Sequence, residues 1–495
     1  MRMPAPDPAL IARKDEIVRA LKAIVPGEGV VSAPEGLVPF ESDGLSAYRQ
    51  TPIAVVLPQT TAQVADILRW CGANGVKVVP RGAGTSLSGG ALPLTDGIVL
   101  GLSKFNRILE VDYENRCAVV QPGVTNLAIT EAVQADGFYY APDPSSQIAC
   151  TIGGNVAENS GGVHCLKYGL TTNNLLGCEI VLMSGEVVRL GGRGHDAAGY
   201  DLLGVVTGSE GLLGVITEVT VRILPKPEAA QALLLGFPSV EAAGACVGDI
   251  IAAGVIPAGL EMMDQPAIRA AEAFVGAGYP VDAQALLIVE LDGPLAECGE
   301  LSAQVEALAL ARGADFVRVS RDEAERLVFW AGRKAAFPAV GRIAPDYYCM
   351  DGTIPRRQLP AVLTRIYEMS ASYGLGVANV FHAGDGNLHP LILYDADQPG
   401  ELETAEAFGA EILKLCVSVG GVLTGEHGVG VEKRDLMGEM FTETDLACQQ
   451  RVKCAFDPDL LLNPGKVFPT LHRCAELGRV HVHAGRTAFP DLPRF

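Results

Sequence analysis

Charge is scarce in this sequence, and most of it carries one sign. Of 495 residues only 19% are charged, and 38 lysines and arginines stand against 58 aspartates and glutamates, for a formal net charge of −20. Nucleic-acid binding needs a basic surface, so this balance excludes proteins of that class. We expect no nucleic-acid partner.

Closely spaced cysteines are missing as well. The 12 cysteines are scattered singly, and no C-x-x-C pair occurs. Such pairs hold zinc ions and iron–sulfur clusters, so we expect neither type of cysteine site within this chain. Scattered cysteines are typical of reduced core thiols, and we predict that all are reduced in a cytoplasmic protein.

Long apolar runs are also lacking. The first 26 residues carry frequent charges and no apolar core of signal-peptide length, so we predict a short amphipathic helix there. The most apolar stretch, Val247 to Leu260, is interrupted by Asp249, Gly254 and Pro257. It is shorter than the ~18–20 residues that a membrane span requires. We expect membrane contact only peripherally, through partners.

Hydrophobic residues and glycine are abundant instead. The hydrophobic share of 48% predicts a folded protein, and 57 glycines indicate many sharp turns or close approaches of backbone to ligand. Short apolar runs alternate with helical patterns as far as Leu224, and Pro225-Lys226-Pro227 then indicates a domain boundary. From Ala232 to Val319 the pattern reads β-α-β-β-α-β, which predicts a ferredoxin-like unit. A helix at Thr404–Val417 leads into a glycine-rich loop and a largely helical C-terminus.

The first glycine-rich loop, Pro80 to Gly90, directly follows an apolar run at Val76–Val79. Its glycines allow backbone N–H groups to approach phosphate oxygens. It does not match a dinucleotide-binding fingerprint, because Leu87 stands where the third glycine belongs, and no Gly-Lys-Ser/Thr follows to make a P-loop. Taken alone, the loop is either a phosphate cradle or a plain turn.

Two further segments extend this pattern. Pro142–Ser146 and Thr151–Gly162 combine two Gly-Gly pairs with amide side chains, and Gly208–Gly214 precedes a strand. Three such segments in order favour an extended backbone along a large polar ligand. The alternative is three tight bends in a sheet-rich domain.

The sharpest group of polar residues lies later in the chain. His382 and His389 flank an expected hairpin bend, and Gly425-Glu426-His427-Gly428 adds a carboxylate and a third imidazole in a glycine-flanked turn. Two histidines and a glutamate form a suitable ligand set for zinc or manganese, and the remaining histidine is then available as a base. The alternative is that these histidines are structural.

Basic residues near position 333 offer a second site feature. Arg333 and Lys334 follow Trp330 on an expected helix, with Arg342 nearby. They form either a solvated basic face or a guanidinium that binds a substrate carboxylate. We assign structural roles to the remaining histidines, which are His164, His195, His472, His481 and His483.

These motifs together resemble the vanillyl-alcohol-oxidase/p-cresol-methylhydroxylase flavoprotein superfamily, in its D-2-hydroxyacid dehydrogenase branch, and there the FAD-binding catalytic subunits of bacterial glycolate oxidases. The resemblance extends nearly end to end, to Pro490–Phe495, and is most specific in Gly332–Arg357, Asn379–Leu393 and Gly425–Gly428. It implies an α+β fold with three parts. These are a two-part FAD-binding domain of the p-cresol-methylhydroxylase type with an N-terminal helix (1–228), a ferredoxin-like α+β cap that binds substrate (229–420), and a helical C-terminal segment that completes the active site and the flavin site (421–495).

The resemblance also implies where FAD binds, with its pyrophosphate on the first loop. Thr85 stands where some members carry a histidine joined to the flavin, so the FAD is expected to be non-covalent. The residues implied to contact FAD are Pro80, Arg81, Gly82, Ala83, Gly84, Thr85, Ser86, Ser88, Pro142, Asp143, Pro144, Thr151, Gly153, Gly154, Asn155, Ala157, Asn159, Gly161, Gly162, Glu210, Gly211, Ile216 and Asn463.

The matching positions further imply His382, His389 and Glu426 as ligands of a divalent metal, His427 as the base, and Arg333 as the group that holds the substrate carboxylate. Cys349 stands where relatives that oxidise a dicarboxylate tend to have lysine, which favours a small monocarboxylate. The implied reaction is oxidation of a small D-2-hydroxy acid, glycolate to glyoxylate in the leading case, by hydride transfer to flavin.

The resemblance implies partners too, a second flavin subunit and an iron–sulfur subunit near the cytoplasmic face of the membrane. Three alternatives remain at this stage. They are a stand-alone D-lactate dehydrogenase that passes electrons to quinone or cytochrome, a flavin-binding electron-transfer subunit without catalysis of its own, and a metal-dependent hydrolase.

Overall fold

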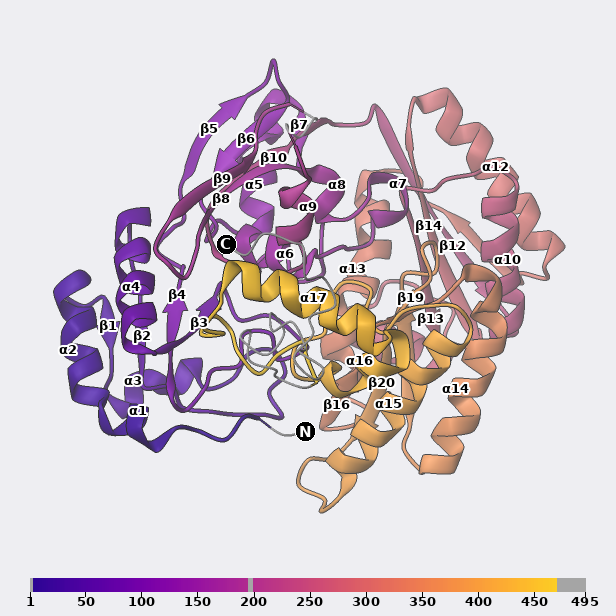
Figure 1. The fold of residues 1–495 in the computed structure, drawn as a ribbon. Coiled ribbons are helices and arrows are strands. Elements are labelled where there is room, and N and C mark those ends of the chain that lie inside the picture. Colours follow the sequence, from indigo (N-terminus) through magenta and orange to yellow (C-terminus); the bar gives the residue numbers. More distant parts are fainter. Residues whose placement is uncertain (1–2, 195–198, 470–495) are drawn as a thin grey trace, which may run out of the picture.

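The computed structural model describes residues 3–194 and 199–469. A four-stranded, a five-stranded and a short two-stranded sheet form before residue 226 and a seven-stranded sheet forms after it, and Figure 1 shows these parts side by side. His195, His472, His481, His483, Cys474 and the segment 490–495 lie outside the described residues. Within the described residues no helix is both long and apolar enough to cross a membrane.

The four-stranded sheet presents the first glycine-rich loop. Its order is β1 (Val30–Val31), β2 (Ala54–Val56), β4 (Gly97–Gly101), β3 (Lys77–Arg81). Helix α4 (Thr61–Asn74) connects β2 to β3, begins with the Thr60 hydroxyl accepting the Gln63 N–H, and ends at Gly75 with φ +65°. Because β2 and β3 both run parallel to β4, the loop leaves the carboxyl end of β3 at one sheet edge. On the outer side α1 (Pro8–Ala12) and α2 (Lys14–Ile24) bury Leu10, Ile17 and Leu21.

The five-stranded sheet is antiparallel and supports the second group of loops. Its order is β5 (Ile108–Asp112), β6 (Cys117–Val120), β10 (Val215–Arg222), β8 (Leu175–Val181), β9 (Val187–Gly191). β8 and β9 pair as an antiparallel hairpin. Helix α6 (Ile152–Glu158) packs Ile152 and Val156 against this sheet, and α5 (Asn126–Val133) adds Ile129 and Val133 to the same core. The shorter elements here are α3 (Pro34–Leu37), β7 (Phe138–Tyr139), α7 (Cys165–Tyr168), α8 (Thr171–Asn174), α9 (Leu202–Val206) and β11 (Leu224–Pro225).

The seven-stranded sheet contains the predicted ferredoxin-like unit. Its first four strands are ordered β15 (Phe316–Val319), β12 (Ala229–Phe237), β14 (Ala285–Gly293), β13 (Gly259–Asp264), all antiparallel. In sequence order this is fourth, first, third, second, which confirms the predicted unit. The sequence pattern did not identify α11 (Gln265–Val275), which lies between β13 and β14. Three of its four buried residues are alanines, so its apolar face is weak.

Three more strands extend this sheet toward the site. The order continues β18 (Val377–Phe381), β20 (Pro390–Tyr394), β16 (Asp346–Cys349). After β16 the strand direction is broken, because Met350 and Asp351 separate β16 from β17 (Gly352–Thr353), which pairs with β19 (Asn387–Leu388). This break turns Asp351 into the interior, where it is fully buried.

Strand alternation places a core on each face of the large sheet. Leu233 and Leu235 belong to one core and Ala232 and Leu234 to the other, as a period of two requires. One face is covered by α10 (Val240–Ala252), α12 (Leu295–Ala311), α14 (Leu359–Tyr373) and α15 (Glu401–Ser418). The opposite face is covered by α11 and α13 (Glu323–Val340).

The chain after residue 420 joins the two halves. It contains α16 (Met437–Met440) and α17 (Glu443–Phe456), and Figure 1 shows α17, in yellow, between the N-terminal sheets and the large sheet. The N–H of Val78 donates to the carbonyl of Leu461, and the N–H of Asn463 donates to the carbonyl of Val78. The Lys453 ammonium donates to the carbonyl of Leu212 at 2.6 Å. This segment therefore closes the fold by returning to strand β3.

Most cysteines are buried thiols, as predicted. Among the residues that the structure describes, ten cysteines are free, and eight of these are buried, whereas Cys165 is partly exposed and Cys448 exposed. Cys454 is disulfide-bonded, so the prediction of uniformly reduced cysteines is wrong at this position.

An ionic network ties the loop at 142–144 to strand β14. The His164 ring lies 2.9 Å from Asp143 Oδ1 through Nδ1 and 3.2 Å from Glu290 Oε1 through Nε2. Glu290 also pairs with Arg326 at 2.6 Å and accepts from the Trp330 indole. Burial by itself lowers the pKa of His164, but the two carboxylates outweigh it and raise that pKa to about 10. The same contacts lower the pKa of Glu290 to about 2, against its burial.

This network predicts a pH-dependent part of the stability. The pKa of His164 is about 10 in the folded chain and about 6.5 in the unfolded one, so its stabilisation is complete below pH 6.5 and lost as the pH rises to 10. We expect the difference in Tm between wild type and His164→Gln to be largest near pH 6 and to shrink toward pH 10. Thermal unfolding at several pH values measures this. A difference that stays constant with pH would contradict it.

Candidate active site

A cavity of ≈ 380 Å³ lies among the three glycine-rich segments and the strands of the large sheet. Its wall includes the first loop from Pro80 to Leu87, parts of the segments 144–160 and 209–216, and three residues of α13. His382, His389, Glu426 and His427 line it as well. Segments more than 300 residues apart in the sequence thus share one cavity.

Most residues implied to contact FAD lie on this wall. They are Pro80, Arg81, Gly82, Ala83, Gly84, Thr85, Ser86, Pro144, Thr151, Gly153, Gly154, Asn155, Ala157, Glu210, Gly211 and Ile216. Gly84 has φ +75°, and a Cβ on it would lie 2.2 Å from the Arg81 guanidinium. The loop therefore needs glycine here, and it folds around a buried cation. The Thr151 hydroxyl is buried without a hydrogen-bond partner among the described residues.

The other residues implied to contact FAD do not line the described cavity, but they contact segments that do. They are Ser88, Pro142, Asp143, Asn159, Gly161, Gly162 and Asn463. Ser88 donates its hydroxyl to the carbonyl of His427 at 2.9 Å. The Asn463 amide donates to the carbonyls of Gly90 and Glu210 at 3.0 and 2.7 Å. These side chains use their polar groups to join loops together, so they position the residues that face the cavity.

The remaining supporting residues act in the same way. Gly161 donates its backbone N–H to Glu426 Oε2 at 3.0 Å, and Asn159 accepts the N–H of Thr172 at 2.9 Å. The carbonyl of Pro142 accepts from Asn126 at 3.0 Å. Gly162 has φ +142°, and a Cβ on it would lie 2.5 Å from the Asp143 carbonyl, so only glycine permits that packing.

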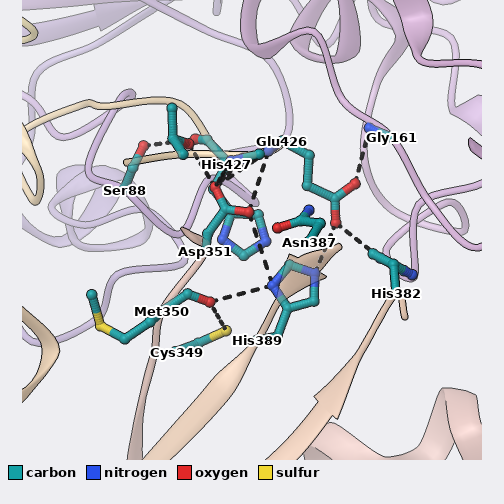
Figure 2. Close-up of polar contacts among 12 residues, drawn as sticks. Ser88, Gly161, Cys349, Met350, Asp351, His382, Asn387, His389, Glu426 and His427 are labelled. Carbon is teal, nitrogen blue, oxygen red and sulfur yellow. Dashed lines mark hydrogen bonds and ion pairs between the residues drawn. The ribbon is translucent and has the colours of Figure 1, made fainter. Parts of the chain in front are cut away.

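His382, His389 and Glu426 converge at one end of the cavity. The Nε2 atoms of both histidines lie 3.2 Å from Glu426 Oε1, and one ligand atom from each of the three residues lies within 4.8 Å of the others. Figure 2 shows the Glu426 side chain directed toward both imidazoles. The three come from the end of β18, the start of β20 and the 425–428 turn. This arrangement fits a divalent ion with two nitrogen ligands and one oxygen ligand.

The other nitrogen of each imidazole is also engaged, which fixes the rings. His382 Nδ1 lies 2.7 Å from Glu261 Oε1, and His389 Nδ1 lies 3.3 Å from the carbonyl of Met350. Such contacts orient ligating histidines and select the tautomer that presents Nε2. Although burial alone lowers the pKa of His382, Glu261 and Glu426 raise it well above its usual range. Glu426 conversely has its pKa lowered well below the usual range by the two histidines, in spite of burial.

His427 faces the same space from the glycine-flanked turn. Its ring stacks on His389 with centroids 5.0 Å apart and an interplanar angle of 12°. Burial lowers the pKa of His427 to about 4, with His389 and Lys433 adding to the effect and Asp351 opposing it. Its Nδ1 is buried and has no hydrogen-bond partner among the described residues. A neutral imidazole with a free nitrogen can accept a proton.

Asp351 holds the turn that carries Glu426 and His427. Its carboxylate accepts backbone N–H groups from Gly425 at 3.0 Å, Glu426 at 3.2 Å and His427 at 2.9 Å, and the Thr424 hydroxyl at 2.5 Å. Burial would raise its pKa, but His427, Lys433 and His389 lower it to about 2. Asp351 was not predicted as a site residue, because no local sequence pattern distinguishes it.

Arg333 lies next to the metal-ligand set but is not among the residues that line the described cavity. Its side chain is 1% exposed, and its Nε and Nη2 lie 2.8 and 2.7 Å from Glu261 Oε2. Its Nη1 has no hydrogen-bond partner among the described residues. The adjacent Lys334 lines the cavity instead, together with Phe337 and Pro338. Glu261, also not identified from the sequence, thus joins Arg333 to His382.

Comparisons with known proteins agree with this architecture. The model of an FAD binding domain matches residues 52–191, and the model of the C-terminal domain of FAD linked oxidases matches residues 226–467. The chain is 58% identical to the glycolate oxidase subunit GlcD of Escherichia coli strain K12, over 97% of each chain. It is 32% identical to a D-lactate dehydrogenase of Anaerostipes hadrus, over 91% of this chain and 97% of that one.

The solved structures show the same fold. p-Cresol methylhydroxylase with substrate bound superposes with a TM-score of 0.79 at 17% identity, over 94% of this chain and 98% of that one. This likeness confirms the predicted α+β fold of the p-cresol-methylhydroxylase type. The chain belongs to the FAD-linked oxidases of the vanillyl-alcohol-oxidase/p-cresol-methylhydroxylase superfamily.

The geometry predicts which residues hold a metal ion. We expect Glu426→Gln and His389→Ala to reduce the divalent metal content of the purified protein, because each removes a ligand from the set of three. Elemental analysis after buffer exchange measures this.

Cys349→Ala is the matched control for the metal prediction. Cys349, His389 and His427 also place ligand atoms within 4.8 Å of one another. We expect Cys349→Ala to retain the metal. Loss of metal in Cys349→Ala but not in Glu426→Gln would assign the ion to the thiol-containing set instead.

Proposed function

We propose that this FAD-linked oxidase oxidises glycolate to glyoxylate. The observation that carries the proposal is the convergence of His382, His389 and Glu426 with the neutral His427 at one end of the cavity. The name of the relative that is 58% identical supports glycolate as the substrate. D-Lactate is a second candidate substrate, because a relative with 32% identity is named a D-lactate dehydrogenase.

The residues present fit the groups that this chemistry requires. The glycine-lined wall with the buried Arg81 cation and the unpaired Thr151 hydroxyl suits the polar part of FAD, bound without a covalent link at Thr85. His382, His389 and Glu426 suit a zinc or manganese ion. When bound, FAD supplies a two-electron acceptor and the ion supplies a Lewis acid that favours ionisation of the substrate hydroxyl.

His427 is the proposed base. A substrate hydroxyl held near Glu426 and His389 lies beside the stacked His427 ring, whose pKa of about 4 keeps it neutral at physiological pH. His427 takes the hydroxyl proton as the hydride leaves Cα. Asp351 positions His427 through its backbone N–H, and its negative charge stabilises the imidazolium that forms.

Arg333 is the proposed partner of the substrate carboxylate. It is an unusual cation, because Glu261 neutralises one edge of the guanidinium while Nη1 remains buried without a partner. An unpaired buried donor is costly, and a carboxylate from the substrate would satisfy it. Glu261 links this group to His382, so the carboxylate and hydroxyl positions are held in one network.

The electrons removed from the substrate are proposed to leave through partner proteins. The relative with 58% identity is named as a subunit of glycolate oxidase, which supports an assembly with other chains. We propose a second flavin subunit and an iron–sulfur subunit as partners, since the sequence has no C-x-x-C pairs for clusters of its own. Contact with the cytoplasmic face of the membrane would then be peripheral and made through these partners.

Replacing His427 tests the base. We expect His427→Gln to keep bound FAD but to slow anaerobic reduction of the flavin by glycolate about 10²–10⁴-fold, the range of general base catalysis. Stopped-flow absorbance follows the reduction and the visible spectrum of the purified protein reports the FAD. Reduction at the wild-type rate would exclude His427 as the base.

Replacing the neighbouring cations tests the carboxylate site. We expect Arg333→Lys to raise KM for glycolate at least tenfold and to lower kcat, because lysine cannot reproduce the guanidinium geometry. Lys334→Met is the control and should leave both within about twofold. Steady-state kinetics decide between them, and a raised KM in Lys334→Met alone would transfer the role to the cavity-lining lysine.

A further inference from the structure

Phe337 is an aromatic ring inside an otherwise small and polar part of the cavity wall. Among the described lining residues it supplies the only phenylalanine, tyrosine or tryptophan side chain. It belongs to the same face of α13 as Arg333, one helical turn further on. Lys334 and Pro338 line the cavity beside it and are exposed, so this face of the helix lies between the cavity and solvent.

The ring touches both groups that are proposed to hold the substrate. Its centroid lies 6.0 Å from Cζ of Arg333 and 6.4 Å from the centroid of His389. Its other neighbour is Tyr347 of β16, at 6.2 Å between centroids. Phe337 therefore lies beside both the proposed carboxylate position and the proposed hydroxyl position, and Tyr347 packs against it in a T-shaped contact.

The four substituents on Cα of a 2-hydroxy acid show what the position of Phe337 means for substrate binding. Cα carries a carboxylate, a hydroxyl, the hydrogen that leaves as hydride, and one further substituent. If Arg333 binds the carboxylate and the metal-ligand set binds the hydroxyl, Cα lies between them, and the ring that neighbours both groups bounds the space left for the fourth substituent. This reasoning rests on the proposed function.

We propose that Phe337 determines substrate size by limiting this fourth substituent to hydrogen or methyl. Glycolate and D-lactate are then accepted, whereas an ethyl or longer chain meets the ring. The chemical class of substrate is thus the two- and three-carbon 2-hydroxy monocarboxylates. The Phe337 ring contacts Arg333, His389 and Tyr347, so it cannot change rotamer to admit a larger substituent without losing these contacts.

Shortening the side chain tests the proposal. We expect Phe337→Ala to raise the ratio of kcat/KM for D-2-hydroxybutyrate to that for glycolate at least tenfold, since one methylene in a pocket changes discrimination about 10–200-fold. Phe337→Leu should give an intermediate ratio. The leucine variant keeps more of the packing around position 337, so it still reports the change in the ratio if the alanine variant folds poorly.

Phe274→Ala is the matched control. Phe274 also carries a guanidinium over its ring, with Cζ of Arg342 5.5 Å from the centroid, but it lies on α11 outside the described cavity wall and is 47% exposed. It should leave the ratio within about twofold of wild type. An unchanged ratio in both Phe337 variants, or efficient oxidation of D-2-hydroxybutyrate by wild type, would overturn the proposal.

A binding measurement separates this inference from the proposed function. Glyoxylate and 2-oxobutyrate are titrated into each holoprotein, and the change in flavin absorbance gives the two Kd values. We expect Phe337→Ala to improve the relative affinity for 2-oxobutyrate at least tenfold, and an unchanged relative affinity overturns the role of Phe337. Failure of the proposed function looks different, because the wild-type flavin would then stay oxidised with glycolate and D-lactate while the binding ratio still decides on Phe337.

Discussion

The arrangement of this site depends on the buried carboxylate of Asp351. Four donors from the turn 424–427 converge on it, three of them consecutive backbone N–H groups, and the Lys433 ammonium lies 3.6 Å away. A buried charge is tolerated only when it is paired and hydrogen-bonded, and here the backbone supplies most of the bonds. The turn must therefore adopt the one conformation that satisfies Asp351, and that conformation presents Glu426 and His427 to the cavity.

Glu261 plays the matching role on the large sheet. It is fully buried on β13 and is contacted by the imidazole of His382 and the guanidinium of Arg333. Burial raises the pKa of a carboxyl group, yet the two partners lower the pKa of Glu261 below its usual value. One anion thus orients a metal-ligand candidate and a cation at the same time. The position of the hydroxyl and the position of the carboxylate are then fixed relative to one another, which is what a reaction at the carbon between them requires.

The cavity lies between halves that are held together from several directions. The His164 network connects the loop at 142–144 to β14, and the segment after residue 420 returns to pair with β3. The first glycine-rich loop is also attached to the turn that carries His427, because the Ser88 hydroxyl donates to the carbonyl of His427. Cofactor site and substrate site are therefore parts of one connected structure.

The sequence by itself determined the features that depend on local pattern. Alternating apolar residues and helical periodicity predicted the ferredoxin-like unit, and glycines at set intervals predicted the loops that now line one cavity, because these signals act between residues close in the chain. Tertiary structure decided the rest. Asp351 hydrogen-bonds to Gly425, 74 residues away, and Glu261 contacts His382, 121 residues away. The sequence pattern did not predict α11, because its buried residues are mostly alanine. Whether Arg333 or Lys334 faces the cavity depends on how α13 packs on the sheet, and a helix fixes the angle between adjacent side chains but not the direction in which either points.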